Sequence, residues 1–148
     1  MPQAKTADHV TTQSRVEVTS YARTIIDPSD DSGVAIVETR LGERFTGGLI
    51  GVGVAMHVRL ERPDGGGTLI CYERIRGELD GRKGAFLLEA SGFMTPSGHV
   101  HGRWEIVPGS ATGELDGLRG YAAFGARRDA AAETGWSAET ALTYWFDD

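Results

Sequence analysis

The stretch IGVGVAMHVRLE, residues 50–61, decides the fold class. Large aliphatic side chains alternate along it with small or polar ones, without interruption. The aliphatic positions are Ile50, Val52, Val54, Met56, Val58 and Leu60. Strict alternation with a period of two is typical of a β-strand that has one buried face. We therefore predict a strand here, and we expect its aliphatic residues from Ile50 to Val58 to face the protein interior.

Clusters of turn-forming residues divide the rest of the chain at short intervals. The clearest clusters span residues 27–33, 62–67 and 95–98 and consist mainly of Gly, Pro, Asp and Ser. Between such clusters the sequence predicts about eight strands and an all-β fold. They run near residues 15–26, 33–40, 43–61, 68–78, 84–93, 99–107, 120–127 and 137–146. Long strands joined by short hairpins favour a closed eight-stranded antiparallel β-barrel over a sandwich, because closure removes exposed sheet edges.

Length and composition limit the classes of protein to consider. The 148 residues suffice for one domain, and the formal net charge of −6 argues against nucleic acid or an anionic membrane surface as a partner. No apolar run is long enough to span a bilayer. Since Cys71 is the only cysteine, an intrachain disulfide and a zinc site of several cysteines are excluded. Residues 1–14 have no apolar signal-peptide core, so we expect a disordered polar tail before a barrel domain at 15–148, in a cytoplasmic protein.

An internal repeat marks two connections between strands. GELDGRKG at residues 77–84 recurs as GELDGLRG at residues 113–120. Glycine adopts positive φ without steric cost, so we expect Gly81 and Gly117 to do so in equivalent turns or bulges. The leucine of each copy is expected to plug one end of the barrel.

Two longer blocks carry a family resemblance. YERIRGELDGRKGAF at residues 72–86 and VPGSATGELDGLRG at residues 107–120 resemble the bacterial DUF3224 family, over about residues 43–144. The resemblance implies a small barrel like that of allene oxide cyclase, of lipocalin-like closed form. Related barrels include spirotetronate cyclases, which fold a polyene chain for a cycloaddition. Family members often carry His where this chain has Ala90, so no role that depends on that histidine is carried over.

Several short motifs do not indicate a cofactor or a metal. Residues 109–120 are rich in glycine but lack the Lys-Ser/Thr pair of a phosphate-binding loop. His99 and His101 would share one face of a strand, yet a zinc site needs a third ligand there, and an exposed face is the better interpretation. We predict no cofactor and no metal. Cys71 has no histidine partner nearby in sequence, which favours a buried, inert thiol over a nucleophile.

Glu73 is the strongest candidate for a functional group. In the strand from Thr68, two arginines, Arg74 and Arg76, lie on the opposite face, so Glu73 should point inward with Cys71. A carboxyl group in an apolar barrel must be paired or have a raised pKa. A raised pKa suits a general acid or base, whereas a paired carboxyl would pin the barrel; the sequence leaves both open.

Aromatic residues on the predicted strands form either a packed core or the walls of a ligand pocket. Small residues beside them would leave space for a hydrophobic, partly unsaturated ligand. The predicted catalytic residues are Glu73, Tyr144 and Trp104. The predicted ligand-binding residues are Leu69, Cys71, Phe86, Leu88, Ala90, Met56, Val54, Leu142 and Phe146.

The sequence thus suggests a cofactor-independent cyclase or isomerase of the natural-product type. Catalysis would come mainly from holding a hydrophobic, partly unsaturated small molecule in a reactive shape, with a few polar groups to orient or polarise it. The alternatives are a small-molecule carrier or sensor on the same barrel and a structural protein with a filled core. A homodimer is possible, and neither nucleic acid nor membrane is expected as a partner.

Overall fold

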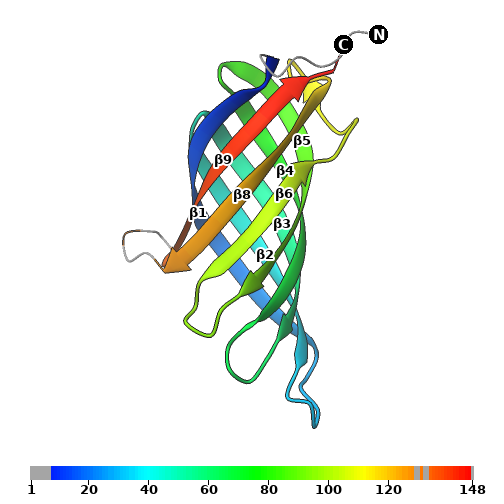
Figure 1. The fold of residues 1–148 in the computed structure, drawn as a ribbon, viewed down its shortest axis with the longest axis vertical. Coiled ribbons are helices and arrows are strands. Elements are labelled where there is room, and N and C mark those ends of the chain that lie inside the picture. Colours follow the sequence, from blue (N-terminus) through cyan, green and yellow to red (C-terminus); the bar gives the residue numbers. More distant parts are fainter. Residues whose placement is uncertain (1–7, 129–130, 132–133, 148) are drawn as a thin grey trace.

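Antiparallel strands account for most of residues 8–128, 131 and 134–147, which are the residues that the computed structural model describes (Figure 1). The strands are β1 (Val10–Asp27), β2 (Ala35–Gly47), β3 (Leu49–Glu61), β4 (Gly67–Leu79), β5 (Arg82–Met94), β6 (Val100–Ile106), β7 (Thr112–Gly113), β8 (Leu118–Arg128) and β9 (Trp136–Phe146). Among these residues, no helix is long and apolar enough to cross a membrane.

Strand pairing closes the sheet into a barrel. Neighbours pair in the order β1, β2, β3, β4, β5, β6, β8 and β9, and β9 pairs back with β1. The two residues of β7 add to β5 outside this ring. The prediction of an all-β, closed eight-stranded antiparallel barrel is therefore confirmed.

Two predicted strand boundaries are wrong. β1 begins at Val10, so residues 10–14 belong to a strand that pairs with β9 and not to a polar tail; residues 1–7 of that tail lie outside the described part of the chain. The buried hydroxyl of Ser14 accepts a hydrogen bond from the Leu49 N–H at 3.0 Å, which ties this segment to β3. The second hairpin turns at Gly47 (φ 111°) and not near residue 42, so β2 is longer and β3 shorter than predicted.

Tight turns lie at the end of the barrel where β1 begins and β9 ends (Figure 1). Buried side chains of the core cluster close this end. Asp80 (φ 47°) and Gly81 (φ 91°) form the two-residue turn between β4 and β5, and positive φ at both positions is what a type I′ hairpin requires. Gly117 has φ 84°, so the expectation for both glycines of the repeat is confirmed. Leu79 and Leu115 are fully buried in the core cluster, as the plug prediction requires.

The predicted orientation of β3 is wrong. Its aliphatic residues Ile50, Val52, Val54, Met56 and Val58 lie on the outer wall, with Val54 66 % exposed. The inward face carries Gly51, Gly53, Ala55, His57 and Arg59 instead. Small residues are needed there because neighbouring strands direct large groups inward: a Cβ on Gly53 would collide with the Glu73 carboxyl and lie 3.1 Å from the Phe45 ring. The possible homodimer stays a prediction.

Candidate active site

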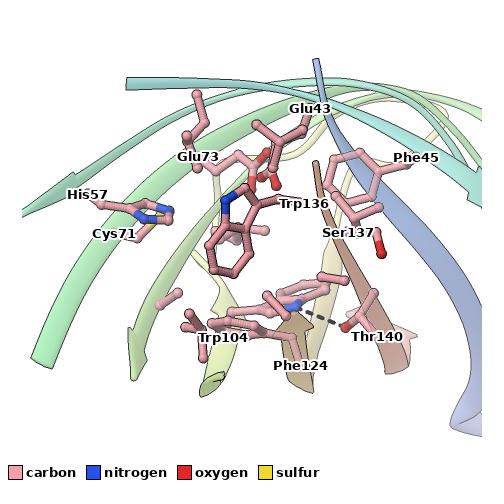
Figure 2. A pocket seen from close by; sticks show the side chains of 18 of the residues that line it. Glu43, Phe45, His57, Cys71, Glu73, Trp104, Phe124, Trp136, Ser137 and Thr140 are labelled. Carbon is pink, nitrogen blue, oxygen red and sulfur yellow. Dashed lines mark hydrogen bonds between the residues drawn. The ribbon is translucent and has the colours of Figure 1, made fainter. Parts of the chain in front are cut away.

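The barrel interior is hollow toward the end opposite the closed one. A cavity of about 140 Å³ lies there, and side chains from strands all around the barrel line it. Most of its wall is apolar, including Phe45, Leu88, Trp104 and Phe124 (Figure 2). The polar groups are few, so each of them has a strong influence on what the cavity can bind.

Two glutamates meet in this cavity. Glu73 projects inward from β4 and is 6 % exposed, so the orientation predicted from its strand face is confirmed. Glu43 reaches the same place from β2, and its carboxyl interacts with that of Glu73, whose Oε2 is buried without a hydrogen-bond partner among the described residues. Figure 2 shows the two carboxyl groups side by side at one wall of the cavity.

The environment of this pair favours a shared proton. Burial raises the pKa of Glu73 well above its ordinary value, and the negative charge and hydrogen bond of Glu43 raise it further. Burial also raises the pKa of Glu43, against the opposing effect of the hydrogen bond from Glu73. Two carboxylates this close cannot both ionise easily in an apolar site, so the two groups titrate as a pair, and burial together with the charge of Glu43 favours protonation of Glu73.

A second polar group of side chains lies nearer the mouth of the cavity, where β3 supplies His57 and Arg59. Burial and the charge of Arg59 lower the pKa of His57 to about 4, so its ring is neutral at neutral pH. Trp136, at the start of β9, lies over the cavity in Figure 2, and the Arg128 guanidinium sits 5.7 Å from the centre of its ring.

Cys71 lines the cavity as a thiol. It is buried, and burial together with the charges of Glu73 and Glu43 raises the pKa of its thiol. Thiolate is the nucleophilic form of cysteine, so this environment disfavours nucleophilic catalysis. The placement agrees with the expectation of a buried, unreactive side chain.

The other two predicted catalytic residues have their polar atoms engaged elsewhere. Trp104 lines the cavity, but its indole N–H donates to the Thr140 hydroxyl at 3.1 Å, and that hydroxyl donates to the Ala123 carbonyl at 3.0 Å. Tyr144 does not line the cavity. At the closed end its hydroxyl donates a hydrogen bond to the Asp80 carboxylate at 2.6 Å. Burial is the larger cause and the contact with Asp80 the smaller cause that raise the pKa of Tyr144 to about 12.

The predicted ligand-binding residues divide into three groups. Cys71, Leu88 and Ala90 line the cavity. Leu69, Phe86 and Leu142 are buried in the surrounding core without lining it, and the Phe146 ring packs under the Arg82 guanidinium at 4.2 Å. Val54 and Met56 are on the outer wall, so their assignment to the cavity is wrong for the reason given for β3.

Sequence reasoning missed Glu43, His57, Arg59 and Trp136. Alternation along residues 35–47 would have placed Glu43 inward with Leu41 and Phe45, and Arg40 and Arg44 outward. The misplaced strand break near residue 42 hid this signal. The pattern in residues 50–61 predicts that the face of β3 with His57 and Arg59 lies on the outer wall, and for this reason the sequence did not point to these two residues.

Metal ligation has no support among the residues that the structure describes. No three or more of their His, Cys, Asp and Glu side chains are grouped so that they could hold a metal ion. His99 and His101 are exposed, with ring centres 6.2 Å apart.

Comparison with known proteins identifies the family. No curated protein matches this chain. A crystal structure of a DUF3224-family protein of unknown function from Shewanella oneidensis MR-1 is similar, with a TM-score of 0.73 and 23 % identity over 95 % of this chain and 99 % of that one. The family model, described as "Protein of unknown function (DUF3224)", matches residues 12–134 and so begins well before the resemblance near residue 43. The chain therefore belongs to the DUF3224 family.

Proposed function

We propose that the cavity binds a small, largely apolar, partly unsaturated molecule and isomerises or cyclises it without a cofactor. The observation that carries this proposal is the Glu43–Glu73 pair, which places two carboxyl groups side by side in an apolar cavity that raises the pKa of both. In the proposed mechanism the pair holds one proton at neutral pH, with Glu73 as the acid and Glu43 as the carboxylate. A base and an acid held ready at neutral pH are what proton-transfer catalysis needs.

The proton-transfer step follows from the two roles. The Glu43 carboxylate takes a proton from the carbon next to a substrate carbonyl, and the C–H electron pair becomes part of a dienolate. The Glu73 acid donates a hydrogen bond to the oxygen on which negative charge develops. Glu43 then returns its proton to the far end of the unsaturated system, so the double bond has moved and both glutamates regain their starting states.

Cavity size limits the substrate. An apolar cavity of about 150 Å³ holds a molecule the size of benzene. The cavity of about 140 Å³ therefore suits a substrate body of about one ring. This is smaller than the polyene chains on which the related spirotetronate cyclases act.

The test is isomerisation of a β,γ-unsaturated cyclohexenone to its conjugated isomer in heavy water, followed by absorbance and by mass spectrometry of deuterium uptake. We expect catalysis by the wild-type protein and a fall of roughly 10²-fold or more in Glu43→Gln and in Glu73→Gln. Glu105→Gln, on the exposed face of β6, is the control and should keep the wild-type rate. Equal rates of conversion to the conjugated isomer in all three variants would refute the proposal.

A carrier without catalysis is the second candidate. It is favoured by the engagement of the Trp104 N–H with Thr140, which leaves few free donors to polarise a substrate. Binding of small apolar molecules without any conversion to the conjugated isomer would support the carrier and not the isomerase.

A further inference from the structure

Arg59 is a cation inside the barrel without a carboxylate partner among the described residues. It lines the cavity from β3, and its guanidinium contacts the Met94 sulfur at 3.3 Å and His57 Nδ1 at 3.5 Å. Its Nε is buried and donates to none of the described residues. A partly buried guanidinium with an unused, buried N–H favours a ligand group that accepts hydrogen bonds and carries negative charge.

The nearest carboxylate along β3 is already engaged. Glu61 lies two residues from Arg59 on the same face, but it binds Arg23 at 2.8 Å. Among the described residues no ion pair joins Arg59 to either glutamate of the acid pair, and Glu73 lies opposite Ala55, four residues back along β3. Four residues of strand span about 13 Å. No carboxylate of the described residues is thus paired with Arg59, which leaves donors of its guanidinium for a ligand.

The His57 ring beside Arg59 also carries a hydrogen-bond donor. A guanidinium can only donate, so His57 Nδ1 accepts from Arg59 and the neutral ring carries its proton on Nε2. A group that accepts hydrogen bonds and carries negative charge fits these surroundings.

We infer that Arg59 binds the carboxylate of the ligand, so that the substrate class is a small unsaturated carboxylic acid. The carboxylate lies at the mouth on the Arg59 guanidinium, and the apolar, unsaturated body extends inward to Glu43 and Glu73. This inference rests on the proposed function, since it names the substrate class of the same cavity. Charge-assisted hydrogen bonds to a guanidinium fork are strong and directional, so a ligand would enter in one orientation.

The experiment compares two probes of the same shape, cinnamate and cinnamyl alcohol, by calorimetric titration of the wild-type protein and of Arg59→Met. Methionine retains much of the length and packing of arginine but removes the charge and donors. We expect the wild type to bind cinnamate at least about tenfold more tightly than the alcohol. In Arg59→Met the preference should disappear through loss of cinnamate affinity, with the affinity for the alcohol unchanged.

Two further variants keep the outcomes distinct. Arg59→Lys retains the charge and should retain part of the preference even if Arg59→Met folds poorly, and Glu105→Gln, on the exposed face of β6, should retain all of it. Equal binding of the two probes by the wild type, binding of neither, or a full preference in Arg59→Met would overturn the inference. Failure of the cyclohexenone assay with the preference intact would instead refute only the proposed catalysis.

Discussion

Glu43 and Glu73 meet because inward positions of β2 and β4 lie on either side of the same small residues of β3. Gly53 is paired with Glu43, and Ala55 is paired with Glu73. The inward orientation of Glu73 could be predicted from its own strand, since Arg74 and Arg76 had to lie outside. Its partner could not, because the contact joins residues 30 positions apart through a register that alternation within one strand does not reveal.

Stability should fall with rising pH because of Glu73. Its pKa is raised on folding, so the folded state binds this proton more tightly than the unfolded state. The stabilisation is complete below the unfolded value of about 4.3 and is lost as the pH rises through the folded pKa. His57 acts in the opposite sense, because its pKa is lowered to about 4 and it destabilises the protein as the pH falls below about 6.5.

Above about pH 6.5 the effect of Glu73 is therefore separate from that of His57. We expect the free energy of unfolding of the wild type, measured by urea denaturation, to fall there by up to about 1.4 kcal/mol per pH unit. Glu73→Gln should have a flatter profile, and Glu105→Gln should follow the wild type. A wild-type profile as flat as that of Glu73→Gln would show that Glu73 is already ionised.

Gly53→Ala should destabilise the protein by about 1–3 kcal/mol, because the new methyl group collides with the Glu73 carboxyl and crowds the Phe45 ring. Gly125→Ala on β8 is the matched control, since a Cβ there meets nothing within 4 Å, and it should cost little. Urea denaturation measures both. Equal costs for the two substitutions would contradict the packing described around Glu73.

At the scale of elements, β3 shows what alternation can and cannot predict. The pattern in residues 50–61 correctly predicted a strand, but it did not say which face is buried. The β3–β4 register decides this, because Ala55 pairs with Glu73 and directly opposed residues share a face. An inward Glu73 therefore requires an inward Ala55 and an outward Val54. The large aliphatic side chains of β3 lie on the outer wall because Phe45 from β2 and Glu73 from β4 already occupy the interior beside Gly53.

The β4–β5 hairpin depends on its turn residues. Gly81 has φ 91°, and a Cβ at this position would meet nothing within 4 Å. A substitution of Gly81 would therefore lower the free energy of unfolding only through backbone strain, and not through a steric clash. We expect Gly81→Ala to lower the free energy of unfolding by about 1 kcal/mol. Chemical denaturation of Gly81→Ala and of Gly125→Ala checks this, because the backbone at Gly125 is not in the positive-φ region. A cost no larger than that of Gly125→Ala would mean that the turn does not require glycine.

At the scale of the whole molecule, the barrel could be predicted from repeated turns and alternating strands, and the cavity could not. The two ends differ because the segment between β6 and β8 brings Leu115 and Ala111 into the closed end, while in the opposite half a second buried cluster, which includes Leu69, Met94 and Val100, leaves the cavity beside it. The packing of side chains from distant strands decides where space remains. A chain with 23 % identity has a similar fold, so this architecture tolerates wide changes in sequence.

The central claim is that Glu43 and Glu73 share one proton at neutral pH inside the cavity. Carbon NMR of protein labelled at the glutamate carboxyls measures this directly. Near pH 7 we predict one glutamate carboxyl with the chemical shift of a protonated acid, and we predict that this signal is absent from Glu73→Gln. If instead every glutamate carboxyl is ionised near pH 7 and titrates close to the ordinary value of about 4.3, the account is contradicted.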